Sequence, residues 1–223
     1  MAIEESSVVA AASSAAKFWA TLGGFKTKIL GVEKVGQIHF FYNGSFKKLE
    51  SFFKKISTDI IKDLRPITSN MEKRGGGISS LELVDMNKKI DCYYQIFVKF
   101  NTIDSMGANF INSCLEKITE VFKFYIEEKK FLDGVTEKID FIMSILSNYT
   151  PNCIAKASVN CKVKDLEKNN ELNNTNFVEN FIRAVKISKV DTFRAVTHNK
   201  GIMNGIDSVV VATGNDFRSV EAS

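Results

Sequence analysis

The sequence has 223 residues, of which 44% are hydrophobic and 25% are charged, and its formal net charge is +4. This balance indicates a folded globular protein with one large domain or two small ones. The lysines are scattered, which favours a solvated surface over a nucleic-acid-binding stripe. No apolar run reaches the about 18 residues of a membrane span. We therefore expect neither a nucleic acid nor a membrane as partner.

The cysteine and histidine residues lack the spacing that is typical of a metal site. The four cysteines are spread along the chain without a CxxC pair: Cys92, Cys114, Cys153 and Cys161. This spacing predicts reduced, mostly buried thiols and a cytoplasmic protein. His39 and His198 stand alone, as structural histidines do. The motifs GxGxxG, GxxxxGKS/T and GxSxG are missing, so a bound nucleotide would not use a Rossmann fingerprint.

The first predicted helix has Ser7 as its N-cap, continues through a stretch rich in alanine and serine, and ends at Gly23 and Gly24. Its small side chains suit close packing against another helix. Glu4 and Glu5 come just before it, where carboxylates ordinarily interact with the positive end of the helix dipole.

Six elements follow in the order strand, helix, strand, strand, helix, strand. They are predicted over residues 35–43, 45–64, 78–86, 91–100, 107–130 and 137–148. Ser45 is a plausible cap of the first of these helices, and Pro66 follows its end. The order is that of the split βαβ, or ferredoxin-like, arrangement. The predicted fold class is therefore α+β, with this βαββαβ unit inserted into a mainly helical domain.

The segment after Pro151 is predicted to hold a strand over 153–163, an Asn-rich polar loop over 167–176 and a helix from Phe177 to about Lys189. A further helix is expected to begin near His198. The predicted domain borders divide the chain into 1–34, 35–148 and 149–223.

A lysine, an asparagine and an aspartate stand close together in THNKGIMNG and VVVATGNDFR. Lys200 and Asn204 are four residues apart and share a face if one helix covers both. An ammonium group is a strong donor to an oxygen that gains negative charge, and Asp216 would hold that group charged if the chain folds back. A surface lysine and an aspartate at a helix end fit the same spacing, and spacing alone favours this ordinary interpretation.

Two glycine-containing loops fit contacts with phosphate. In DSMGANFIN, Gly107 permits close approach of backbone, the helix N-terminus offers free N–H groups, and Asp104 suits a ribose hydroxyl. A plain capped helix start explains these residues equally well. The loop KRGGGISS over 73–80 is the weaker candidate, because three glycines alone say little.

Six stretches occur in the order and at the spacing of one enzyme family: EESSVVAAASSAAK, RGGGISSLE, DSMGANFIN, ILSN, FRAVTHNKGIMNGID and VVVATGNDFRSVEA. Together they span the chain from residue 4 to 223 and closely resemble class II 3-hydroxy-3-methylglutaryl-coenzyme A (HMG-CoA) reductase. The resemblance implies an oxidoreductase of the mevalonate and isoprenoid pathway. Its reaction reduces HMG-CoA through mevaldehyde to mevalonate and CoA with two hydrides from NADPH or NADH, and some members work in the degradative direction.

The resemblance also implies roles for individual residues. Lys200 matches the catalytic lysine that stabilises the oxyanion, Asp216 the aspartate that tunes this lysine, and Glu5 the proton-donating glutamate. The substrate-binding positions are matched by Ser7, Arg194 and Asn204. The nicotinamide-nucleotide site is matched by Asp104, Met106, Gly107, Ala108 and Asn148, and Ser80 stands where an NAD-preferring relative has aspartate. The βαββαβ unit is then the cofactor domain, and the flanking segments belong to the substrate domain.

Departures from the family pattern lead to further expectations. Ser6 replaces a usual proline. An acid in place of Ser80 would accept from the ribose 2′-OH and repel a 2′-phosphate, so Ser80 favours NADPH. The family's N-terminal part and its C-terminal flap with a histidine have no counterpart here. We therefore expect a central fragment that is inactive alone, or at most an NAD(P)-binding module. The family's active sites lie at a dimer interface, which implies a homodimer.

Overall fold

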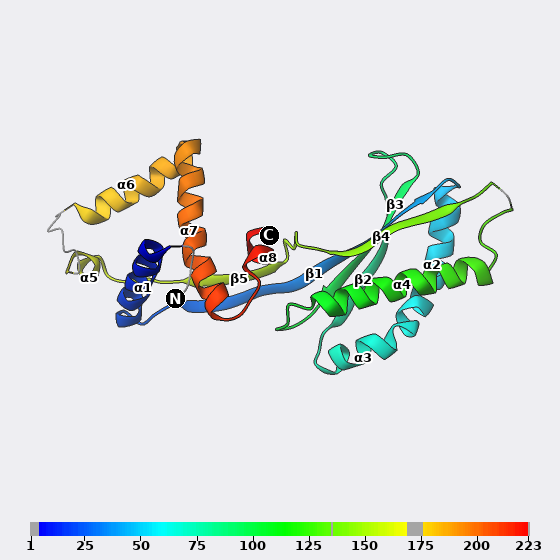
Figure 1. Cartoon of the computed structure of the whole chain (residues 1–223), viewed down its shortest axis with the longest axis horizontal. Helices are drawn as coiled ribbons and strands as arrows, with labels where there is room; N and C mark the ends of the chain where they lie inside the picture. The colour runs from blue at the N-terminus through cyan, green and yellow to red at the C-terminus, as the bar shows by residue number, and fades with distance from the viewer. Residues whose placement is uncertain (1–4, 135, 169–175, 223) are drawn as a thin grey trace. The chain divides into compact units, whose positions relative to one another are not determined.

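The computed structural model describes residues 5–134, 136–168 and 176–222 (Figure 1). The chain divides into two compact units. One is continuous and covers residues 29–154, and the other combines the described residues of 1–28 with those of 155–223. The borders of the continuous unit lie a few residues outside the predicted 35–148.

The continuous unit is built on an antiparallel sheet. The strands are β1 (Lys26–Tyr42), β2 (Gly77–Asp85), β3 (Tyr93–Asn101), β4 (Ile139–Ser147) and β5 (Cys153–Ser158). Four strands follow the order β2-β3-β1-β4 with antiparallel pairs, and β5 pairs with β1. The predicted strands occur in the expected order, with α3 as an additional helix before β2, and β3 separates β1 from β2 as in a split βαβ unit.

Helices cover one face of this sheet and form the core with it. They are α2 (Phe46–Asp63), α3 (Arg65–Lys73) and α4 (Ala108–Glu128). Side chains alternate along a strand, and the even-numbered residues of β1 face the helices. Ile38 and Phe40 are fully buried there, and a Cβ on Gly36 would lie 2.7 Å from Leu115 Cδ1 of α4. The cluster of buried apolar side chains extends from Ile38 to Phe131 and lies entirely within this unit.

The second unit is mainly helical. Its helices are α1 (Ser6–Thr21), α5 (Val163–Lys168), α6 (Phe177–Val190), α7 (Thr192–Ala212) and α8 (Phe217–Ala222). Helix α7 contacts α1, α6 and α8. Among the described residues of this unit only Ser188 and Ser208 are buried, whereas Val190 and Phe193 are 86% and 87% exposed. The described part of this unit therefore has no apolar core of its own.

One boundary prediction before residue 100 was wrong, and one helix was missed. Strand β1 begins at Lys26 rather than residue 35, because its first half pairs with β5, a partner that local sequence does not reveal. Helix α2 ends at Asp63, before Pro66 as predicted, but α3, which was not predicted, follows it directly. That proline lies at the start of α3, where its missing N–H removes no helical hydrogen bond.

Two further boundaries need correction in the C-terminal segment. The strand predicted over 153–163 ends at Ser158, and α5 follows. The helix expected near His198 begins at Thr192, because the Asp191 carboxylate caps it by accepting from the backbone N–H groups of Phe193 and Arg194 at 2.9 and 3.2 Å. Most of the predicted Asn-rich loop, residues 169–175, lies outside the described residues.

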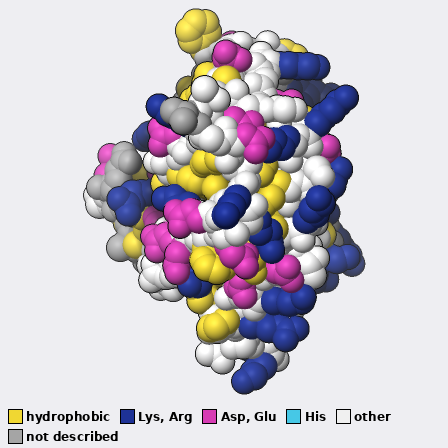
Figure 2. Space-filling view, turned by 90° about the vertical axis from the view of Figure 1, so that its right-hand side faces the viewer, with side chains coloured by type: hydrophobic (Ala, Val, Ile, Leu, Met, Phe, Trp, Pro, Cys, Tyr) yellow, Lys and Arg dark blue, Asp and Glu magenta, His cyan; other side chains and the backbone are white. Residues whose placement is uncertain are grey.

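The distribution of charged side chains on the surface can be compared with the scattered lysines of the sequence. Figure 2 shows basic and acidic side chains interspersed with apolar ones on the face in view. No helix within the described ranges is long and apolar enough to cross a membrane.

All four cysteines are free, as predicted, but only Cys114 is buried, and burial raises the pKa of its thiol to about 12. The expectation of mostly buried thiols was therefore wrong for the other three.

Candidate functional site

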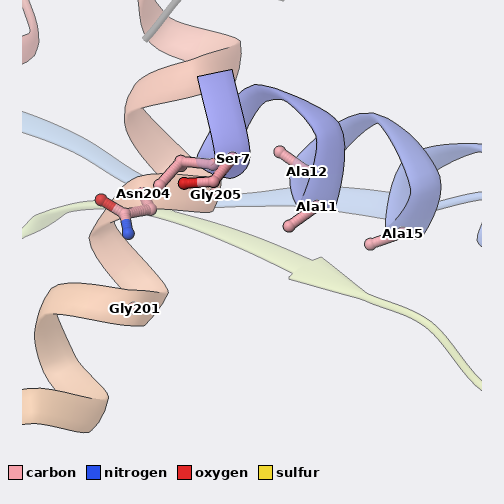
Figure 3. Close-up of a pocket in the computed structure, with 8 residues that line it drawn as sticks. Ser7, Ala11, Ala12, Ala15, Gly201, Asn204 and Gly205 are labelled. Carbon is pink, nitrogen blue, oxygen red and sulfur yellow. The ribbon is translucent and has the colours of Figure 1, made fainter. Parts of the chain in front are cut away.

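A groove of about 440 Å³ lies between α1 and α7 and is lined mostly by small side chains (Figure 3). Its lining comprises Ser7, Val8, Ala11, Ala12 and Ala15 of α1 with Gly201, Asn204 and Gly205 of α7. A Cβ on Gly201 or Gly205 would meet nothing within 4 Å. Helix α1 contacts α7, as its small side chains predicted, but space remains beside Gly201 and Gly205. The small residues leave space for a ligand, and Ser7 and Asn204 supply polar groups at its wall.

The start of α1 brings two of the predicted site residues together. The prediction of Ser7 as N-cap was wrong, because the helix begins at Ser6 and Glu5 occupies the cap position with extended backbone. Ser7 lies in the first turn instead, and its Oγ donates to Oε1 of Glu5 at 2.8 Å. The candidate proton donor is thus hydrogen-bonded to a side chain that lines the groove.

Helix α7 positions three predicted residues. It covers both Lys200 and Asn204, so their predicted common face is confirmed. Asn204 is half-buried against the groove, and Lys200 is exposed and directly precedes the groove residue Gly201. Arg194 lies six residues before Lys200, which at 3.6 residues per turn rotates it by about 120° from that lysine. Arg194 is not part of the groove wall.

Asp216 caps the short helix α8. Its Oδ1 accepts from the backbone N–H groups of Arg218 and Ser219 at 3.1 and 3.3 Å, and Arg218 Nε lies 3.6 Å away. Lys200 precedes Ala212, the last residue of α7, by twelve residues, or about 18 Å along the helix axis. The ordinary role of an aspartate at a helix end is therefore present, and its pairing with Lys200 stays a prediction.

The residues predicted to bind the cofactor gather at one end of the sheet. Asn101, the last residue of β3, pairs with Glu33 of β1 and with Gly77 at the start of β2, and Val35 of β1 pairs with Ser147 at the end of β4. This register brings together the start of β2, the loop after β3 and the residue after β4. The predicted residues there are Ser80, Asp104, Met106, Gly107, Ala108 and Asn148.

The loop from β3 to α4 has a fixed conformation that requires glycine. Gly107 is the N-cap of α4 with φ +75°, and a Cβ there would lie 2.5 Å from Thr102 Cγ2. The first N–H groups of α4 follow it and have no partner within the helix. Asp104 Oδ1 accepts from Arg74 Nη2 at 2.6 Å, and both side chains are exposed. This ion pair connects Arg74, in the predicted glycine loop, with Asp104, the residue predicted to bind a ribose hydroxyl.

Ser80 lies beside an irregularity in β2, opposite Lys99 of β3. Its Oγ is buried and has no hydrogen-bond partner within the described part of the chain. The neighbouring Ser79 is exposed and lines a hollow of about 460 Å³ together with Glu33 and Asn152. Asn152 Nδ2 donates to Glu33 Oε1 at 2.8 Å. This end of the sheet is therefore rich in polar groups.

Sequence reasoning did not single out Lys34, which reaches the candidate cofactor loop. Its Nζ donates to the carbonyl oxygens of Ser105 and Met106 at 2.9 and 2.7 Å. Burial lowers the pKa of this ammonium group. The sequence feature that could have identified Lys34 is its charge, because the same face of β1 otherwise carries Gly36, Ile38 and Phe40.

Comparison with known proteins now identifies the family. A family model described as hydroxymethylglutaryl-coenzyme A reductase matches residues 1–223. The chain belongs to the HMG-CoA reductase family. It is 34% identical to the HMG-CoA reductase of Archaeoglobus fulgidus over 228 residues, and 34% identical to a probable HMG-CoA reductase of Borreliella burgdorferi over 225 residues. Both alignments cover all of this chain but only 47% and 48% of the relatives.

Solved structures of HMG-CoA reductase share this fold. An HMG-CoA reductase of Streptococcus pneumoniae superposes with a TM-score of 0.76 at 30% identity, over 99% of this chain and 56% of its own. The same values hold for a class II HMG-CoA reductase of that organism, bound to NADPH in open conformations. The expected family and the mixed fold with an antiparallel sheet are confirmed. The chain spans about half the length of the curated HMG-CoA reductases that it matches.

Proposed function

We propose that the natural gene product carrying this sequence is an HMG-CoA reductase, which converts HMG-CoA to mevalonate and CoA with two equivalents of NADPH or NADH. The match of the family model to all 223 residues carries this proposal. The position of Ser7 and Asn204 at one groove, with Lys200 beside it, supports the same chemistry. The mevalonate and isoprenoid pathway is the metabolic context, and the degradative direction would use the same groups.

The substrate groove holds the HMG moiety in this proposal. The Ser7 hydroxyl and the Asn204 amide bind its polar groups, and the small residues of α1 accommodate its methyl group. The family pattern also assigns Arg194 to substrate binding, but Arg194 does not line this groove. Lys200 donates to the thioester oxygen as negative charge builds up there. One preorganised donor of this kind contributes about 3–4 kcal/mol to stabilisation of the transition state.

Two carboxylates complete the proposed catalytic set. Asp216 keeps the Lys200 ammonium charged and oriented, since a nearby opposite charge favours the charged form. Glu5 donates a proton when the first tetrahedral intermediate collapses to mevaldehyde, and again in the second reduction. Its hydrogen bond to Ser7 supports a location beside the groove.

The chemistry of the donor set at the sheet end fits a nicotinamide dinucleotide. Gly107 lets phosphate approach backbone N–H groups at the start of α4, because that position has no room for a Cβ. The exposed Asp104 carboxylate suits a ribose hydroxyl, and Ser80, Met106, Ala108 and Asn148 complete the set. When bound, the reduced nicotinamide supplies the hydride. The NADPH complex of the pneumococcal relative supports this choice of cofactor, and Ser80 in place of an acid favours NADPH.

The two compact units support the assignment of cofactor binding and substrate binding to separate domains. In this proposal the unit of residues 29–154 is the ferredoxin-like cofactor domain, inserted into a mainly helical substrate domain. The exposed apolar side chains of α6 and α7 support a homodimer with the active site at its interface. We place the protein in the cytoplasm, as its free cysteines favour.

A direct assay tests the proposed function. The purified natural gene product is mixed with HMG-CoA, and loss of the reduced-nicotinamide absorbance is followed with NADPH and NADH in separate reactions. Acetyl-CoA serves as the matched control, because it has the thioester but lacks the HMG moiety that Ser7 and Asn204 recognise. We expect oxidation with HMG-CoA only. Absence of oxidation with either dinucleotide would remove the reductase assignment.

A non-catalytic NAD(P)-binding module is the second candidate, and the half-length coverage of the relatives supports it only weakly. The two candidates differ in turnover by the 223 residues alone. General-acid assistance of thiolate departure is worth about 10²- to 10⁴-fold, and the family's donor has no counterpart in this sequence. Calorimetric binding of NADPH by the isolated chain without turnover would support the module, and activity within about tenfold of the natural gene product would exclude it.

A further inference from the structure

Lys34 joins the central strand of the sheet to the candidate cofactor loop. It lies on the helix-covered face of β1, at the sheet end where the predicted cofactor residues gather. Its ammonium donates to two consecutive carbonyl oxygens, those of Ser105 and Met106, across 71 and 72 residues of sequence. The Ser105 carbonyl also accepts from the Thr102 hydroxyl at 2.8 Å. One long-range cation therefore holds the middle of a short loop.

The charge on Lys34 is essential to this arrangement. Burial lowers the pKa of the ammonium group because desolvation disfavours the charged form. Two carbonyl acceptors offset part of this cost, since hydrogen bonds to a charged donor are stronger than neutral ones. An apolar side chain of similar length would leave both carbonyl oxygens without this donor, and the loop would lose this anchor to β1.

The loop that Lys34 holds determines how α4 begins. The residue after Met106 is Gly107, whose left-handed conformation precedes the first residue of α4, and the first N–H groups of that helix have no acceptor within it. Thr102 is fully buried and contacts this glycine, so the base of the loop is fixed by packing. The conformation of the segment between Thr102 and Gly107 depends instead on hydrogen bonds to its carbonyl groups. Lys34 donates two of these hydrogen bonds.

We propose that Lys34 is a positioning residue for the nicotinamide dinucleotide. By holding the carbonyl groups of Ser105 and Met106, it keeps the loop in the conformation that presents the α4 N–H groups to the dinucleotide phosphates. Its positive charge also adds to the potential that attracts an anion at this helix end. The inference rests on the proposed function, because it assumes that the dinucleotide binds at this end of the sheet.

Calorimetric titration of the natural gene product with NADPH and with HMG-CoA tests this role. Lys34→Met removes the charge at similar length, and Lys34→Arg keeps a cation that can donate to both carbonyls. We expect Lys34→Met to raise the Kd for NADPH by about tenfold or more and to leave the Kd for HMG-CoA within about twofold. Lys34→Arg should bind NADPH within about threefold of wild type. If Lys34→Met fails to fold, Lys34→Leu, which also lacks a donor, replaces it in the same comparison.

Lys48→Met is the matched control. Lys48 is a partly buried lysine of the same unit with two ion pairs of 2.6 Å, to Asp133 and Glu137. It lies near Tyr42, the last residue of β1, roughly 26 Å along the strand from Lys34. Its loss should lower the melting temperature without changing either Kd. A change in the Kd for NADPH of similar size in both methionine variants would reduce Lys34 to a general stabilising residue.

The remaining outcomes are separable. Unchanged NADPH binding in Lys34→Met, or equal losses for NADPH and HMG-CoA, would overturn the positioning role while the reductase assignment stands. Binding as weak in Lys34→Arg as in Lys34→Met would show that the cation is not what matters. Wild-type protein that binds neither NADPH nor NADH would overturn the proposed function itself, and the role of Lys34 with it.

Discussion

At the scale of single residues, different residues of the groove between α1 and α7 provide its volume and its polar groups. Gly201 and Gly205 leave the volume open, and Ser7 and Asn204 provide hydrogen-bonding groups. Lys200 is one residue from this wall and is the cation that the family pattern assigns to the developing oxyanion. Its contribution should therefore be made in the transition state rather than in binding of HMG-CoA.

Replacement of Lys200 tests that assignment. In the natural gene product, Lys200→Ala should lower kcat by at least about 100-fold, because about 3 kcal/mol of oxyanion stabilisation is lost. The Kd for HMG-CoA should change little. Steady-state kinetics and calorimetry provide the two numbers. Lys88→Ala is the control, since Lys88 is an exposed lysine in the turn between β2 and β3. A Lys200→Ala variant with a third of the wild-type kcat would contradict the assignment.

Ser80 tests the choice of cofactor. Ser80→Asp should lower the ratio of kcat/KM for NADPH to that for NADH by about tenfold or more, since the new carboxylate repels a 2′-phosphate. Its position opposite Lys99 provides a compensating cation for a carboxylate in a partly buried place. Ser51→Asp, an exposed site on α2, adds the same charge elsewhere and should leave the ratio unchanged. A wild-type protein that strongly prefers NADH would show that the argument from Ser80 is wrong.

At the scale of elements, the loop before β4 is held in part by one carboxylate. Glu137 accepts from Lys48 Nζ at 2.6 Å, from the backbone N–H of Asp133 at 2.8 Å and from the Tyr42 hydroxyl at 3.2 Å. The backbone hydrogen bond, followed by the Lys48 contact, holds the pKa of this carboxyl below its ordinary value. The ionised form of Glu137 therefore contributes to holding the loop, together with Asn43, which is hydrogen-bonded to Thr136 and Lys138.

The pH dependence of stability follows from this shift. A carboxyl whose pKa is lower in the folded state stabilises the protein above the unfolded value of about 4.3, and the stabilisation is lost as the pH falls through the folded pKa. Glu137→Gln should thus lower the melting temperature at pH 7, and the difference from wild type should shrink as the medium is acidified. Glu50→Gln is the control, because its pair with Lys54 is exposed and worth little. A difference that is constant from pH 7 to pH 3 would contradict this account.

Sequence patterns predicted those elements whose signal is local. Alternation of apolar residues located β2, β3 and the second half of β1, and helical periodicity located α2 and α4. The first half of β1 was missed because it is charged and mostly exposed, and only its partner β5 makes it a strand. Helix α3 was missed because Pro66 was taken as a stop, although a proline fits the first turn of a helix.

The candidate site was only partly predictable, for a related reason. Family motifs located Lys200, Asn204 and Gly107, and the helical spacing of the first two was correct. No motif marks Lys34, since its role arises from a contact across 71 residues. Helical spacing alone also did not place Asp216, because its position depends on the turn that ends α7.

At the scale of the whole molecule, apolar burial is distributed unequally. The core cluster belongs to the unit of residues 29–154, whereas the helical unit exposes Phe181, Val190 and Phe193 at 62%, 86% and 87%. Large exposed apolar side chains in such numbers mark surfaces that another protein surface covers. We assign this surface to a second copy of the natural gene product, in line with the proposed homodimer.

The dimer can be tested without disturbing the fold. Phe193→Asp places a carboxylate in the first turn of α7, where the helix dipole favours it, so the protomer should remain folded. Sedimentation velocity should show a dimer for wild type and a shift toward monomer for the variant. Ile90→Asp, at an exposed apolar residue of the other unit, should remain dimeric. A wild-type monomer with full activity would contradict the proposal.

The proposed two-step reduction releases CoA, so the stoichiometry of the reaction tests the reductase assignment. Oxidised dinucleotide is measured by absorbance and free thiol by a colorimetric reagent in the same reaction of the natural gene product with HMG-CoA. We expect two dinucleotides to be oxidised for each thiol released. A ratio of one, or oxidation without release of thiol, would contradict the reductase mechanism built on Lys200, Glu5 and Asp216.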